Sequence, residues 1–120
     1  LPLTKPQLLA QPNSLEQQAD ADARWRHWVN QQLSGTYQQV WAQCDALYLL
    51  QAPDWLQICQ WRAQAEARLR EEQGGGMDPT TLALFMQHYQ RWTLQLLAGH
   101  HVALTAKYYL NETHQIYHQC

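Results

Sequence analysis

The residues with the clearest potential for chemistry are the arginines that follow Trp61. Arg62, Glu66 and Arg70 recur at i, i+4 and i+8, which places them on one face of a helix, while Arg68 lies on a neighbouring face. Planar guanidinium groups hold phosphates through paired hydrogen bonds, so this helix could clamp a phosphorylated ligand. The alternative is a solvated surface on which each intrahelical ion pair contributes about 0.2–0.5 kcal/mol. The residues alone leave both interpretations open.

Other patterns that could carry chemistry are weak. His114, His118 and Cys120 form an HxxxHxC pattern that is not a tetrahedral ligand set of known spacing, so we expect no metal site. Cys59 lies within a helical pattern, and no GxSxG motif supports a nucleophilic triad. The phosphate-loop pattern GxxxxGK[ST] is not found in the chain.

The bulk composition excludes several classes of partner. A formal net charge of −2 provides no general basic surface for nucleic acid or anionic lipid. No run approaches 18 apolar residues, so no membrane-spanning helix is expected. Three well-separated cysteines without a CxxC motif favour reduced thiols in a cytoplasmic protein. Of the six tryptophans, four have helical core spacing and are expected in the core, namely Trp25, Trp28, Trp41 and Trp61.

The elements that must position the arginines follow from periodicity and from helix-capping residues. Apolar residues three and four apart indicate helices, ALYLL indicates a strand buried on both faces, and Asp54 and Asp78-Pro79 are typical helix starts. A glycine run at 74–76 could serve as a hinge. We expect an arm or loop over 1–19, a helical segment over 20–45 that Ser34-Gly35 kinks or splits, a strand over 46–53, a lid helix with its hinge over 54–76, a helix over 77–99 and C-terminal strands over 102–120.

This order of elements predicts a helix-rich α/β fold. A strand, two helices and a further strand are typical of layered α/β architectures. Two or three strands are too few for a buried parallel sheet, since such strands need neighbours on both sides. The chain is therefore expected to be a single domain or a domain fragment, with a parallel sheet that is incomplete within it.

Several segments together resemble a known family. WRAQAE at 61–66, Gly76-Met77, Phe85 and Tyr89 resemble the C-terminal half of the D-glycerate 3-kinase-like P-loop kinases, which carry a W-R-x-x-Q-E helix and a Gly-Met turn. Ala65 and Pro79 depart from that pattern. The resemblance also covers, in the family's order, NSLEQQADADARWRHWVNQQL at 13–33, ALYLLQAP and YYLNETHQIY.

The resemblance implies a three-layer kinase fold and an ATP-dependent, Mg²⁺-assisted transfer of the γ-phosphoryl group to a hydroxyl acceptor such as glycerate. In this family the phosphate loop, or Walker A region, precedes the segment matched here. The chain is thus expected to be the C-terminal portion of a small-molecule kinase, inactive alone, whose partner is the missing N-terminal half. The resemblance leaves homo-oligomerisation open.

The resemblance also assigns roles to residues. Arg62 is the expected catalytic phosphate clamp, with Arg68 and Arg70 in support at the nucleotide, and Glu66 and Gln64 orienting Arg62. The segment with Asn13, Glu16 and Asp20 is expected to face the acceptor. The competing hypothesis is a non-catalytic helical interaction module that uses the tryptophan-rich helix, or a degenerate kinase relative that binds without catalysis.

Overall fold

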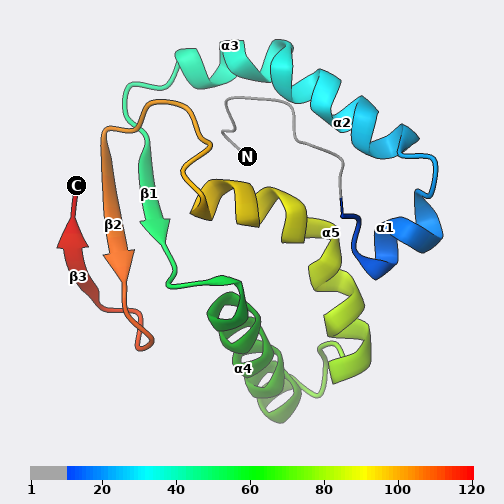
Figure 1. The fold of residues 1–120 in the computed structure, drawn as a ribbon. Helices are drawn as coiled ribbons and strands as arrows, with labels where there is room; N and C mark the ends of the chain where they lie inside the picture. Colours follow the sequence, from blue (N-terminus) through cyan, green and yellow to red (C-terminus); the bar gives the residue numbers. More distant parts are fainter. Residues whose placement is uncertain (1–10) are drawn as a thin grey trace.

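The computed structural model of the protein describes residues 11–120. Within these residues, short helices come first, followed by a strand, two long helices and a final pair of strands (Figure 1). The elements are α1 (Ser14–Ala19), α2 (Arg24–Ser34), α3 (Thr36–Ala42), β1 (Tyr48–Gln51), α4 (Trp55–Gln73), α5 (Pro79–Leu97), β2 (Ala106–Leu110) and β3 (Ile116–Gln119).

The two long helices begin where their sequence signals predict. The Asp54 carboxylate accepts the Gln57 N–H at 2.7 Å and caps α4, and Asp78 caps α5 in the same way. Pro79 occupies the first turn of α5, where its missing N–H leaves no hydrogen bond unmade. At the other end of α4, Gly74 adopts the left-handed conformation that stops the helix.

Helix α1 corrects the expectation of an arm over 1–19. The Asn13 side chain accepts the Glu16 N–H at 2.9 Å, and the Glu16 carboxylate accepts the Asn13 N–H at 3.0 Å. This reciprocal capping box satisfies two backbone donors at once and starts a helix directly after the proline-rich segment. The rest of that expectation, for residues 1–10, lies outside the described residues.

The helical segment expected over 20–45 divides into α2 and α3 at Gly35, as its Ser34-Gly35 pair predicts. The expectation that its tryptophans lie in the core is wrong for Trp25 and Trp28, whose surfaces are 63% and 50% exposed. Instead, α2 buries Arg26, Asn30 and Leu33. The inward face is set by a buried ion pair at the helix start, and this rotates the two indoles outward.

The strands form one mixed sheet in the order β1-β2-β3. β1 pairs with β2 in parallel, with Tyr48 opposite Ala106, and β2 pairs with β3 as an antiparallel hairpin. The prediction that the first strand is buried on both faces is wrong, because alternate residues of β1 are exposed. Within residues 11–120 no further strand or tightly packed helix covers that face.

The core between these elements is small. The radius of gyration is 16.1 Å, whereas a compact domain of this length has a value of about 13–14 Å. Helices α4 and α5 pack against one another, and α1 lies against α5. The buried apolar residues among those described are Leu33, Ala52, Leu82, Met86 and Ala106.

Candidate functional site

The turn between α4 and α5 is held by side chains from the end of α4. The buried Glu66 carboxylate accepts the Met77 N–H at 2.9 Å, and the Arg70 guanidinium donates to the Met77 carbonyl oxygen. Gly76 adopts a φ of +102° and lies so close to Glu66 that a Cβ would stand 2.9 Å from its Oε2 atom. The glycine run predicted as a hinge is therefore fixed at its C-terminal end by two side chains of the preceding helix.

Arg62 lies one helical turn before Glu66 and forms an ion pair with its carboxylate. The Arg62 guanidinium carbon lies 5.9 Å from the centre of the Phe85 ring on α5, within the range of a cation–π contact. The side chain remains 45% exposed. A carboxylate on one side and an aromatic ring close by hold the guanidinium in one orientation while part of it faces solvent.

The electrostatics of this cluster favour an ionised Glu66. The hydrogen bond from the Met77 N–H lowers the pKa of the Glu66 carboxyl, and the positive charges of Arg62 and Arg70 lower it further against the opposing effect of burial. Arg62 forms an ion pair with this carboxylate, and Arg70 contributes a second positive charge nearby. Such a cluster can attract an anion at its exposed end.

The other predicted members of the arginine site do not converge on Arg62. Arg70 is used to hold the Met77 carbonyl oxygen. Arg68 is exposed to solvent, and Gln64 is exposed on α4 and forms no hydrogen bond with Arg62 in the described structure. Of the two predicted orienting residues, Glu66 contacts Arg62 and Gln64 does not.

Trp61 attaches this part of α4 to the sheet. Its indole Nε1–H donates to the Glu112 carbonyl oxygen at 3.0 Å, and its ring stacks on His114 with the centroids 3.9 Å apart. Both partners lie in the turn between β2 and β3. The residue immediately before Arg62 therefore connects the helix to the hairpin, more than 50 residues further along the chain.

A second polar cluster joins α1 to α5. The Arg91 guanidinium forms a two-pronged ion pair with Glu16, through Nε to Oε1 at 2.9 Å and Nη2 to Oε2 at 2.7 Å. The Asn13 amide donates to the Gln87 carbonyl oxygen at 2.9 Å and to the Gln90 side-chain oxygen at 3.2 Å. Asn13 and Glu16, both predicted at the acceptor, thus lie in one network with three polar residues of α5.

Asp20, the third residue predicted at the acceptor, belongs to a different network. Its carboxylate accepts the N–H groups of Trp25 and Arg26, at 2.9 and 3.1 Å, and pairs with the Arg26 guanidinium at 2.9 Å. Burial raises the pKa of Asp20, but these hydrogen bonds and the Arg26 charge outweigh it and hold the pKa below its ordinary value. Asp20 fixes the start of α2 with both oxygens occupied.

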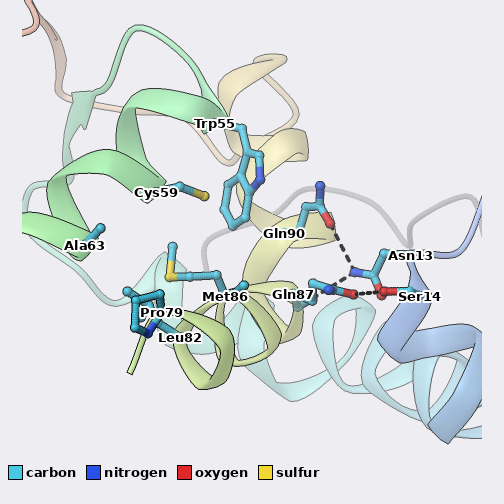
Figure 2. A pocket seen from close by; sticks show the side chains of 11 residues that line it. Asn13, Ser14, Trp55, Cys59, Ala63, Pro79, Leu82, Met86, Gln87 and Gln90 are labelled. Atoms are coloured by element: carbon cyan, nitrogen blue, oxygen red, sulfur yellow. Dashed lines mark hydrogen bonds between the residues drawn. The ribbon is translucent and has the colours of Figure 1, made fainter. Parts of the chain in front are cut away.

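A cavity of about 490 Å³ opens between α4 and α5 beside the Asn13 network (Figure 2). Trp55, Cys59 and Met86 provide much of its apolar wall, and Asn13 and Gln90 lie at its polar end. A neighbouring polar cavity of about 460 Å³ shares Asn13 and Gln90 and reaches Glu16 and Arg91. Both volumes lie in the range of small-molecule sites.

Sequence reasoning missed Gln87, Gln90 and Arg91. They lie at i, i+3 and i+4 on α5, so they share one helical face, and this polar spacing was a signal that could have singled them out. The N-x-x-E pattern at Asn13 and Glu16 likewise signals a capping box.

Within residues 11–120, no group of three or more His, Cys, Asp or Glu residues could hold a metal ion. No helix in that part of the chain is long and apolar enough to cross a membrane.

Comparison with known proteins supports the fold. No family model matches the sequence, and no curated protein matches it. The structure of D-glycerate 3-kinase from Cryptococcus neoformans var. grubii serotype A is similar to this chain, with a TM-score of 0.69 and 21% sequence identity. The match covers 98% of this chain and 45% of that one, so the chain spans less than half the length of the solved protein. The fold, a helix-rich α/β arrangement with a small mixed sheet, resembles part of the glycerate kinase fold and confirms the predicted class and resemblance.

Proposed function

We propose that this chain is the C-terminal portion of an ATP-dependent small-molecule kinase that transfers the γ-phosphoryl group to a hydroxyl acceptor, such as glycerate. The observation that supports this most is the similarity of fold to D-glycerate 3-kinase along 98% of the chain. Fold alone does not define chemistry. The proposal therefore also rests on the oriented, partly exposed guanidinium of Arg62.

Arg62 would act on the phosphates of the nucleotide. Phosphoryl transfer is catalysed mainly by positioning and by stabilisation of charge on the phosphoryl oxygens. Glu66 on one side and Phe85 nearby limit the orientations of the guanidinium before any ligand arrives. A group held in this way loses little conformational freedom when it binds, which favours a role in charge stabilisation.

ATP and Mg²⁺ fit this chain only in part. When bound, Mg²⁺ would supply neutralisation of the negative charge on the phosphates. Residues 11–120 hold no cluster of three carboxylates for a metal, and the chain has no GxxxxGK[ST] loop. The positive cluster at Arg62 suits the phosphates, so the phosphate loop and the metal ligands would come from polypeptide that this sequence does not include.

The acceptor would lie near the polar cluster that joins α1 to α5. Asn13 and Gln90 line both neighbouring cavities, and their amides can donate to or accept from hydroxyl groups. Glu16 and Arg91 neutralise one another in a largely buried pair, so their contribution would be to hold Asn13 in place. Asp20 has no such part in the proposal, because Arg26 and the α2 backbone occupy its carboxylate.

One feature favours the alternative of a non-catalytic interaction module. Trp25 and Trp28 are exposed and stack on each other with centroids 5.0 Å apart. Tryptophan is over-represented among residues that carry protein–protein binding energy, so this pair could face a partner. The module hypothesis predicts a protein whose stability and conformation do not respond to nucleotide.

The test is turnover by the protein in its natural length, with ATP, Mg²⁺ and D-glycerate, followed through ADP formation and mass analysis of the phosphorylated product. Phosphoglycerate formation would support the proposal. Nucleotide binding without turnover of glycerate or related hydroxy acids would identify a degenerate relative. Absence of both nucleotide binding and turnover would contradict the proposal and favour the interaction module.

A further inference from the structure

The cavity between α4 and α5 has an apolar wall built from both helices. In Figure 2 the side chains of Trp55 and Cys59 on α4 point toward Met86 on α5. Leu82 and Met86 also belong to the buried core, so packing fixes the α5 side of the wall. An apolar ring or chain of a ligand would replace water against these side chains, and the removal of apolar surface from water favours binding.

None of the residues that line this cavity carries a formal charge. Burial raises the pKa of the Cys59 thiol, so this group stays protonated and neutral near neutral pH. Glu16 and Arg91 lie outside this cavity, in the neighbouring polar one, where they form an ion pair. A charged ligand would lose its hydration in the apolar cavity without gaining an ionic partner, which costs much free energy. The cavity therefore favours an uncharged ligand.

The polar end of the cavity offers a hydrogen-bond donor. The Gln90 side-chain oxygen accepts the Asn13 amide at 3.2 Å, which fixes the orientation of the Gln90 carboxamide. Its Nε2 nitrogen is turned away from Asn13 (Figure 2) and has no partner among the residues that the structure describes. The Gln90 amide can therefore donate to a hydroxyl, ether or carbonyl oxygen of a ligand.

We propose that the cavity between α4 and α5 is a binding site for an uncharged small molecule that combines an apolar group with an oxygen acceptor, such as an aryl ether of a polyol. The apolar group would lie among Trp55, Cys59 and Met86, and the oxygen would accept from Gln90. The site is additional to that of the proposed acceptor, for which the neighbouring polar cavity with Glu16 remains. It does not depend on the proposed activity.

Matched ligands test the chemistry of this site. The phenyl ether of glycerol carries an aromatic ring and hydroxyl groups, and phenoxylactate has the same skeleton with a carboxylate in place of the terminal CH₂OH. Binding of each to the protein in its natural length and assembly is measured by titration calorimetry, without nucleotide. We expect the ether to bind at least about tenfold more tightly than phenoxylactate, which would bury a charge, and than glycerol, which lacks the ring.

Two leucine variants test the location of binding. Ala63 lines the cavity, whereas Ala65 on the same helix does not. Both alanines are exposed, so neither replacement should lower the urea concentration at which the protein unfolds. Ala63→Leu fills part of the cavity and should weaken binding of the phenyl ether at least about tenfold, because two groups cannot occupy one space. Ala65→Leu should leave the affinity unchanged.

The cysteines provide a second measure of location without mutation. Cys59 lines the cavity, and Cys44 is exposed and lies outside it. Alkylation of each thiol by iodoacetamide is followed by mass analysis of the peptides. A saturating concentration of the phenyl ether should slow the reaction of Cys59 at least about tenfold, since the ligand blocks access to the sulfur. The reaction of Cys44 should keep its rate.

Other outcomes would overturn the proposal. Equal affinities for the ether and phenoxylactate would show that the site does not select an uncharged ligand. Equal effects of the two leucines, with Cys59 unprotected, would place binding elsewhere on the protein. Failure of the ether to bind would show that the natural protein does not keep this cavity open. No phosphoryl transfer is measured, so each of these results leaves the proposed kinase activity to its own test.

Discussion

Gly76 lies against Glu66 so closely that no side chain fits between them. An added Cβ would stand 2.9 Å from the Glu66 Oε2 atom and 3.2 Å from its backbone oxygen, and the φ of +102° disfavours any residue with a Cβ. The same carboxylate binds the Met77 N–H and the Arg62 guanidinium. The conformation of the turn and the orientation of Arg62 therefore depend on one buried group.

Replacement of Gly76 by alanine should destabilise the protein. The positive φ and the contact with the Glu66 backbone each oppose a Cβ, and we expect a loss of about 1–3 kcal/mol in the free energy of unfolding, measured with urea. Gly75→Ala is the control, because a Cβ there meets no atom within 4 Å and its φ lies outside the positive range. Equal stability of the two variants would contradict the fixed turn.

Arg62→Ala should reduce catalysis by the natural-length protein. Loss of one charge-stabilising group typically lowers the rate about 10²–10³-fold, and we expect a fall of this size in kcat/KM for ATP. Because the buried Glu66 carboxylate keeps the Met77 N–H and the charge of Arg70, the unfolding midpoint should fall only slightly. Arg24→Ala removes an arginine that is 86% exposed and should leave both quantities unchanged. Lost stability with intact activity would show a structural role for Arg62.

The Asp20–Arg26 pair should make stability depend on pH. Asp20 has its pKa lowered in the folded protein, so its contribution is present above the unfolded pKa of about 3.9 and is lost as the pH falls through the lower folded value. The difference in unfolding free energy between the unmodified protein and Asp20→Asn should therefore be constant near neutral pH and shrink below about pH 4. Asp22→Asn, at an exposed position, is the control. A difference that grows on acidification would refute this assignment.

Glu16 and Arg91 should be energetically coupled. Removing one partner of a largely buried pair weakens the compensation of the other charge, so Glu16→Ala should cost about 1–3 kcal/mol in unfolding free energy. Arg91→Ala should have a similar effect, and the double variant should lose much less than the sum. A double-mutant cycle from urea denaturation measures this coupling. Additive losses would mean that the two side chains act independently.

The sequence predicted the long elements well because their ends carry local signals. The ends of these helices depend on backbone groups within four residues of Asp54, Asp78, Pro79 and Gly74. A single sequence is therefore enough to predict where the helices begin and end. The positions of the strands along the chain and the Gly35 break were also predicted from local patterns. The missed helix α1 was also readable, since its capping box spans only four residues.

Burial and side-chain partners were harder to predict. Trp25 and Trp28 have the spacing of a core face, but the buried Asp20–Arg26 pair decides which side of α2 points inward. Glu16 meets Arg91 across 75 positions in the chain, and Trp61 meets Glu112 across 51. Periodicity describes a single element, so it cannot reveal which charged faces two distant elements bring together.

The stacked tryptophans on α2 have an optical consequence. Their ring planes are inclined by only 19° with the centroids 5.0 Å apart, so the two indole transitions should couple and produce a paired signal in circular dichroism. Both rings are exposed, so a dissolved quencher should reach their fluorescence readily. A blue shift in emission with reduced quenching would then mark the moment when another surface covers α2, without any label added to the protein.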